Sequence, residues 1–86
     1  MAAKHFIIGV HVSQRVKQIP NVQAILTKFG CNIRTRLGLH NADGKTCPTG
    51  GLLILDLVGS DRECNKLASA LAAIKGIEVK KMIFRK

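Results

Sequence analysis

The sequence predicts a single α+β domain whose elements follow one another in the order β-α-β-β-α-β. Two observations support this prediction. Four stretches are apolar at every second residue or throughout, as strands are, and two stretches are apolar at intervals of three and four residues, as amphipathic helices are. The chain has 86 residues, of which 47% are hydrophobic. This is enough for one two-layer domain covering residues 1–86, and too apolar for a disordered segment.

The first half of the chain predicts a strand, a helix and a second strand. Residues 5–12 alternate, with Phe6, Ile8, Val10 and Val12 on one face. Pro20 is suited to open a helix, because the first helical position needs no N–H donor. The helix stripe is Val22, Ile25, Leu26 and Phe29, and Gly30 ends it. Residues 31–40 form the next predicted strand, with Ile33 and Leu37 facing the helices and Arg34, Arg36 and His40 on the opposite face.

The second half repeats this pattern after a turn-rich loop at residues 41–50. Residues 51–58 are apolar except for Asp56 and form the third strand. Ser60 and Glu63 have the spacing of a capping box and predict the start of the second helix. Its apolar stripe is Cys64, Leu67, Leu71 and Ile74. The last strand covers residues 77–84, and its alternation breaks at Lys80 and Lys81, which predicts a bulge or a frayed edge.

This order of elements, joined by right-handed crossovers, gives the ferredoxin-like βαββαβ sandwich. The expected antiparallel sheet has strand order 4-1-3-2, with both helices on one face. The other face would expose Ile7, Gly9, Leu52, Ile54 and Val58. An apolar surface of this extent is usually covered in a soluble protein, and a second copy is the simplest cover. We therefore expect a dimer or tetramer formed through the exposed sheet face or its edge.

The charge of the chain raises a second function class. Fourteen Lys and Arg against five Asp and Glu give a formal charge of +9, which makes a basic nucleic-acid-binding protein the alternative prediction. An RNA-binding domain of this topology stacks bases on aromatic rings of its central strands. Here those strands offer His5, Ile7, Leu52 and Ile54 on the exposed face and no Phe, Tyr or Trp. Nucleic acid therefore ranks below self-association as a partner.

Location and chemistry are constrained by what the sequence lacks. Three cysteines and no recognisable signal peptide predict a cytoplasmic protein with reduced thiols, and no apolar run is long enough to span a membrane. Of the five acidic residues, Asp61 and Glu63 are explained by the start of the second helix. No histidine, cysteine or serine is placed with an acid as catalysis requires. We predict no enzymatic activity, no cofactor and no metal site.

Four stretches carry a family resemblance: residues 24–30 (AILTKFG), 33–39 (IRTRLGL), 51–57 (GLLILDL) and 71–79 (LAAIKGIEV). They resemble the iron-only hydrogenase system regulators, small ACT-like proteins related to the C-terminal domain of the nickel-responsive repressor. The resemblance covers nearly the whole chain. It implies an ACT-like fold and a stand-alone regulatory or ligand-sensing module that acts through oligomerisation and is linked to iron-only hydrogenase regulation.

A candidate ligand site follows from the predicted strand faces. Arg34, Arg36 and His40 are expected on one face of the second strand, with Asp56 on the neighbouring strand. One carboxylate cannot neutralise two guanidinium groups, so the site would suit an anionic small molecule or the acidic surface of a partner protein. The alternative is an intersubunit ion pair with no ligand. The resemblance to ACT domains implies a competing location at Ser13, in the turn after the first strand.

Overall fold

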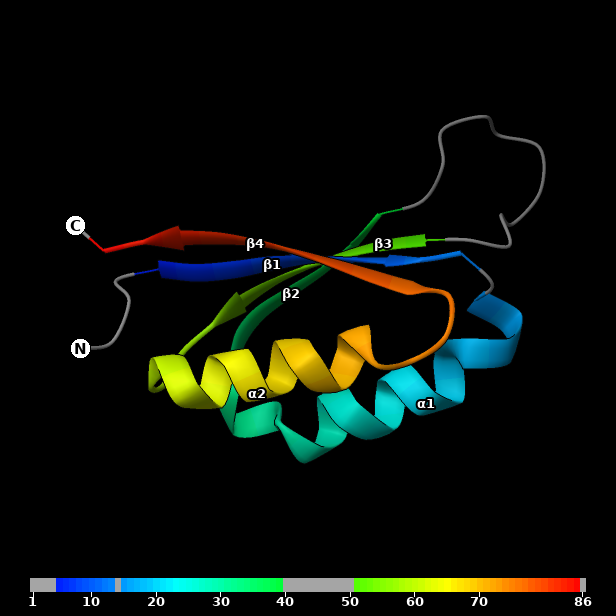
Figure 1. Cartoon of the computed structure of the whole chain (residues 1–86), viewed down its shortest axis with the longest axis horizontal. Helices are drawn as coiled ribbons and strands as arrows, with labels where there is room; N and C mark the ends of the chain where they lie inside the picture. Colours follow the sequence, from blue (N-terminus) through cyan, green and yellow to red (C-terminus); the bar gives the residue numbers. More distant parts are fainter. Residues whose placement is uncertain (1–4, 14, 40–50, 86) are drawn as a thin grey trace.

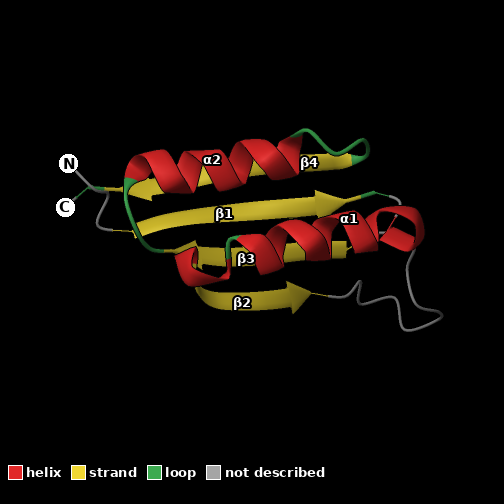
Figure 2. Ribbon diagram, turned by 90° about the horizontal axis from the view of Figure 1, so that it is seen from below, coloured by secondary structure: helices red, strands yellow, loops and turns green. Residues whose placement is uncertain are grey.

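The computed structural model describes residues 5–13, 15–39 and 51–85, without the side chains of residues 15–19 and 39. Its elements are β1 (His5–Val12), α1 (Arg15–Lys28), a 3₁₀ turn (Gly30–Asn32), β2 (Ile33–Leu39), β3 (Gly51–Leu57), α2 (Asp61–Ala72) and β4 (Ile77–Phe84). The strands form one antiparallel sheet in the order β2-β3-β1-β4. Both helices cover the same face of this sheet (Figures 1 and 2). The predicted ferredoxin-like architecture and strand order are confirmed.

The core lies between the sheet and the two helices, and it follows the alternation of the sequence. Every second residue of β1 is buried, together with Leu55 and Leu57 of β3. The helices contribute Val22, Leu26, Cys64, Leu67, Ala68 and Leu71. Burial raises the pKa of the Cys64 thiol, and the carboxylates of Asp61 and Glu63 act in the same direction. Its Sγ lies 3.7 Å from the Val58 carbonyl oxygen, so Cys64 is a protonated core residue, as its place in the helix stripe predicts.

Helix α2 begins with the predicted capping box. The backbone N–H of Glu63 donates to Ser60 Oγ at 3.1 Å, and the backbone N–H of Ser60 donates to Glu63 Oε1 at 3.1 Å. These bonds satisfy two amide groups that the first turn of a helix leaves without partners. The bonds from the Ser60 backbone and hydroxyl hold the pKa of the Glu63 carboxyl below its ordinary value. The cap therefore binds the charged form of Glu63 more strongly than the neutral form.

Helix α1 and strand β2 differ from their predicted bounds. The helix begins at Arg15, so Pro20 lies inside it and does not open it. Val16 and Ile19, three residues apart, continue the spacing of Val22 and Ile25 toward the N-terminus, a signal for the first turn that the choice of Pro20 as the first helical residue missed. Beyond the helix, residues 30–32 form a 3₁₀ turn, and β2 begins at Ile33 instead of Cys31. Asn32 ends this turn and bonds through its side-chain N–H to the carbonyl of Val58, 3.0 Å away.

A β-bulge in β2 corrects the predicted faces of this strand. Ile33 pairs with Leu57, but Thr35 already pairs with the neighbouring residue Asp56, so Arg34 is an extra residue in the ladder. The alternation of the strand is reversed beyond this point. Leu37, expected to face the helices, lies instead on the uncovered face and is 52% exposed.

The same bulge separates the two arginines that the sequence placed together. Arg34 contacts Asp56 on the uncovered face. Arg36 pairs with the buried Leu55 and points to the helix side, where its NH1 donates to Gln23 Oε1 of α1 at 3.3 Å. The prediction that Arg34 and Arg36 share a face is wrong, because one inserted residue shifts the period of two by half a cycle.

Strand β4 is regular where the sequence predicted an irregularity, whereas β2 is irregular where none was predicted. A bulge or frayed edge was expected at Lys80 and Lys81, but β4 pairs with β1 without a register shift from Ile77 to Phe84. Lys81 pairs with Ile8 and thus lies on the helix side of the sheet. Its flexible stem carries the ammonium group to Asn65 of α2, with Nζ 2.8 Å from Oδ1. The alternation in β4 is regular, and a lysine occupies one position at the margin of the core.

Candidate functional site on the open face of the sheet

The sheet face opposite the helices, called the open face below, is the candidate functional surface (Figure 1). Strand register assigns its residues, because cross-strand partners lie on the same side of a sheet. Among residues with described side chains, it comprises His5, Ile7, Gly9 and His11 of β1; Leu52, Ile54 and Asp56 of β3; Arg34, Thr35 and Leu37 of β2; and Glu78, Lys80, Met82 and Phe84 of β4.

Apolar side chains run across the open face. Ile54 lies between Leu37 and Gly9, and Ile7 lies between Asp56 and Met82. Leu37, Met82 and Phe84 are 52%, 56% and 45% exposed, whereas Ile7 and Ile54 are partly buried by their neighbours. Gly9 leaves space in the middle of this surface, since a Cβ there would lie 3.8 Å from the nearest side-chain atom, Ile54 Cδ1.

Arg34 and Asp56 form the polar contact at one side of the open face. Arg34 Nε and NH2 both donate to Asp56 Oδ2, at 3.0 and 2.7 Å. The other carboxylate oxygen, Oδ1, is buried and has no hydrogen-bond partner. Half of the arginine side chain remains exposed. The guanidinium group can therefore take a further anionic partner while it holds the carboxylate, since it carries five donors.

The other predicted site residues do not join this pair. Arg36 lies on the opposite side of the sheet. Ser13 bonds to the turn before β4: its backbone N–H and its Oγ both donate to the Gly76 carbonyl oxygen, at 3.0 and 2.9 Å. His40 lies outside the described residues. The structure thus brings together Arg34 and Asp56 alone among the described candidates.

The described cations and acids of the open face are equal in number, although the chain as a whole is strongly basic. Its two described cations, Arg34 and Lys80, each contact an acid of the same face, Asp56 at 2.7 Å and Glu78 at 3.5 Å. The formal charge of the chain is +9, so the excess positive charge lies outside this set of residues. The helix side carries part of that excess, including Arg62 and Lys66, which are exposed on α2.

Metal binding and membrane insertion can be checked in the same residues. No group of three His, Cys, Asp or Glu side chains capable of holding a metal occurs in ranges 5–13, 15–39 and 51–85. His5 and His11 lie six residues apart on β1, beyond the reach of a single ion. Within the same part of the chain, neither helix is long and apolar enough to cross a membrane.

Sequence reasoning missed the contribution of Leu37, Met82 and Phe84 to the open face. Met82 and Phe84 were identifiable in principle: if the last strand alternates without interruption, they lie on the same face as Lys80, opposite the helices. The two adjacent lysines, Lys80 and Lys81, suggested instead that the alternation was broken. Leu37 could not have been assigned, since the bulge that turns it outward leaves no glycine or proline in the sequence between Ile33 and Thr35.

The fold resembles several solved structures. An uncharacterized protein from Thermotoga maritima is 23% identical, with a TM-score of 0.79 over 92% of this chain and 94% of that chain. The ACT domain of a GTP pyrophosphokinase from Chlorobium tepidum is 19% identical, with a TM-score of 0.66 over 95% and 89%. The fold is ACT-like.

A third solved structure of similar fold carries bound small molecules. It is a nitrogen regulatory PII-like protein from Thiomonas intermedia K12, solved with ADP, AMP and bicarbonate bound. It is 13% identical, with a TM-score of 0.52 over 95% of this chain and 93% of that chain. Identities this low establish the shared fold alone. No protein-family model and no curated protein matches the sequence.

Proposed function

We propose that the chain is a stand-alone ACT-like regulatory module of the cytoplasm, which senses a small anionic ligand, works through self-association and has no enzymatic activity. The observation that carries this proposal is the open face: an apolar sheet surface, left uncovered by both helices (Figure 1), with the exposed Arg34 at its margin. The resemblance to iron-only hydrogenase system regulators in four stretches of sequence makes that system the proposed target of regulation.

Self-association is supported by the charge distribution. Two molecules that each carry +9 repel one another, so they meet most easily where each surface is neutral. On the open face the described cations are paired with acids, and the area between them is apolar. Packing two such faces together removes Leu37, Ile54 and Met82 from water, which favours association. The proposed assembly is a dimer or tetramer built on this contact.

Sedimentation velocity at micromolar concentration tests the assembly. Wild type should sediment as a dimer or larger, and Ile54→Lys should sediment as a monomer with unchanged far-UV circular dichroism, because Ile54 points away from the core. Ala72→Lys adds the same charge at an exposed position of α2 and is the matched control, which should remain associated. A monomeric wild type, or equal dissociation of both variants, would contradict the proposal.

The proposed ligand is a small anion, bound by Arg34 beside Asp56. A guanidinium that already holds one carboxylate with two of its donors has further donors for a carboxylate, phosphate or bicarbonate. The nucleotides and bicarbonate bound to the PII-like protein of the same fold are anions of this class. Arg36, His40 and Ser13 remain alternative ligand positions in the proposal, Arg36 and Ser13 on other surfaces of the molecule.

Thermal-shift measurements with bicarbonate, phosphate, ADP and AMP test the ligand. Since Arg34 and Arg36 lie on opposite sides of the sheet, Arg34→Ala and Arg36→Ala are informative separately. An anion that raises the melting temperature of wild type and Arg36→Ala, but not of Arg34→Ala, supports the open-face site. Stabilisation that survives both substitutions and is lost in Ser13→Ala would move the site to the end of β1.

Nucleic-acid binding is the second candidate, and the observation that favours it is the charge of +9. Arg62 and Lys66, exposed on α2, belong to the basic surface that would contact phosphates. A gel-shift titration at two salt concentrations distinguishes the candidates. Binding to nucleic acid must weaken steeply as salt rises, because phosphate contacts release counterions. Absence of a shift at low salt would remove this candidate.

A further inference from the structure

The two edges of the sheet differ in regularity. Strand β2 has seven residues and contains the bulge at Arg34, which interrupts pairing and increases local twist. Strand β4 has eight residues that pair with β1 without interruption, from Ile77 opposite Val12 to Phe84 opposite His5. An edge strand leaves one row of backbone N–H and C=O groups without strand partners. Of the two edges, β4 presents this row on the strand that pairs without a bulge.

The exposed apolar residues of β4 are consecutive. Met82, Ile83 and Phe84 are 56%, 37% and 45% exposed. Met82 and Phe84 lie on the open face, and Ile83 lies on the helix side, opposite Phe6 of β1. The end of this strand is therefore apolar on both faces of the sheet. A strand added beside it would find apolar contacts above and below its own backbone.

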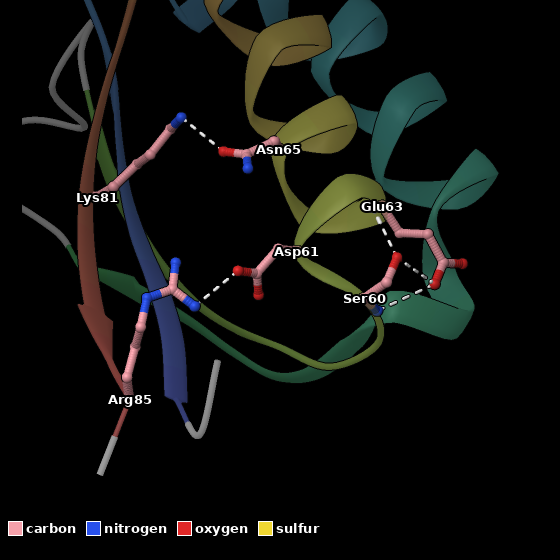
Figure 3. A network of polar contacts seen from close by, with 6 residues as sticks. All are labelled: Ser60, Asp61, Glu63, Asn65, Lys81 and Arg85. Atoms are coloured by element: carbon pink, nitrogen blue, oxygen red, sulfur yellow. Dashed lines mark hydrogen bonds and ion pairs between the residues drawn. The ribbon is translucent and has the colours of Figure 1, made fainter. Parts of the chain in front are cut away.

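Two of the three basic residues of this strand end, Lys81 and Arg85, are held away from the apolar segment. Lysine side chains on edge strands usually oppose the addition of another strand. Here the ammonium group of Lys81 reaches across to Asn65 of α2, and Arg85 NH1 lies 2.7 Å from Asp61 Oδ2 (Figure 3). Both side chains thus extend toward the helix, which leaves Met82, Ile83 and Phe84 uncovered at the edge.

We propose that β4 is a docking site for an extended acidic segment of another protein, which adds to the sheet as a fifth strand. Charge complementarity decides the occupant. Residues 77–85 carry three cations, Lys80, Lys81 and Arg85, against Glu78 of the same strand and Asp61 of α2, which Arg85 contacts, so this edge keeps a net positive charge. A second copy of β4 would bring the same positive charge to this edge, whereas an acidic strand would be attracted to it. Strand addition uses the backbone groups along the edge of β4 and shares Met82 and Phe84 with the open face, so its test is designed to separate it from self-association.

A synthetic peptide provides the probe. A fluorescein-labelled peptide of about seven residues, the length of a typical strand, alternates glutamate with valine. Fluorescence anisotropy with the full chain measures its affinity, and amide chemical shifts of the ¹⁵N-labelled chain locate it. We expect binding, with the largest shifts in β4. A peptide with lysine in place of glutamate should bind about tenfold more weakly or worse. Peptides N-methylated at alternate residues, one at the odd and one at the even positions, should also bind about tenfold more weakly or worse. Strand addition needs the backbone N–H groups that the methyl groups replace.

Matched variants separate the edge from the rest of the surface. Met82→Lys/Phe84→Lys should weaken peptide binding at least about tenfold. Leu37→Lys, which changes an equally exposed apolar residue on the other edge strand, should leave the affinity unchanged. The titration is repeated with Ile54→Lys, so that loss of self-association and loss of strand addition are read separately.

Several results would overturn the proposal. These are no binding of the glutamate peptide at millimolar concentration, equal binding of the N-methylated or lysine peptides, and equal weakening by Leu37→Lys. Shifts confined to β2 would place the peptide at the wrong edge. If the amide chemical shifts of β4 change with protein concentration and do not respond to the peptide, the occupant of this edge is a second copy of the chain.

Discussion

Neighbouring residues of β1 and β3 occupy opposite environments. Ile8 and Leu55 are completely buried under the two helices, while Ile7 and Ile54, one position away on the same strands, remain partly exposed on the open face. The side chains are chemically alike, so residue type does not explain the difference. It arises because the alternation of a strand directs successive side chains to opposite faces, and the helices cover only one of them (Figure 2).

This contrast shows that hydrophobicity in the chain serves two purposes. On the covered face it supplies the core, where buried aliphatic side chains interlock between sheet and helices. On the open face the same residue types are surplus to the fold of one molecule. Substitutions on the two faces should therefore differ in kind, the first affecting stability and the second assembly.

The largest expected difference is between two leucines. Leu71 is completely buried in α2 and Leu37 is half-exposed on the open face. Leu71→Ala should lower the free energy of unfolding by about 2–5 kcal/mol, because it leaves a cavity. Leu37→Ala should change it by no more than about 0.5 kcal/mol. Urea unfolding of both variants, made in the Ile54→Lys background to exclude assembly, measures the difference. Equal costs would mean that the open face contributes to the monomer core.

Two glycines give a smaller contrast. Gly59, between β3 and α2, has φ +110°, and a Cβ there would lie 2.6 Å from Asn32 Nδ2. Gly9, on the open face, has room for a Cβ and no positive φ. Gly59→Ala should destabilise the fold by about 1–3 kcal/mol. Gly9→Ala should be neutral or slightly stabilising, since glycine is unfavourable in a strand. Thermal unfolding of the two variants decides, and a destabilising Gly9→Ala would show that the open face is tightly packed.

The capping box of α2 gives the smallest expected effect. Ser60→Ala should cost about 1 kcal/mol, because it removes the N-cap bond to the Glu63 amide. The pKa of Glu63 is lowered from 4.5 in the folded chain, so its stabilisation is present above that pH and is lost as the pH falls through the folded value. Glu63→Gln should unfold with a weaker dependence on pH below 4.5 than wild type. If the pH dependence of stability is the same in Glu63→Gln and wild type, the Glu63 carboxylate does not contribute to it.

Most of the fold could be predicted because its signals are local. Alternation in β1, the Ser60–Glu63 spacing and the stripe ending at Leu71 each identify an element and its buried face. The candidate site was harder to predict, because it depends on register between strands. The Arg34–Asp56 contact agrees with the prediction for adjacent strands. The separation of Arg36 from this pair depends on the bulge, which arises from the pairing of β2 with β3 and leaves no mark in the sequence of either strand.

The bulge also has an evolutionary consequence. With Arg34 deleted, Ile33 and Thr35 would become consecutive residues of a regular ladder, and each later residue of β2 would keep its present side of the sheet: Leu37 outward, and Arg36 and Gly38 toward the helices. The open face would lose the guanidinium group that contacts Asp56 and would keep its apolar residues. Loss of one residue at this point would therefore remove the proposed anion contact from a related chain without changing the surface proposed for self-association.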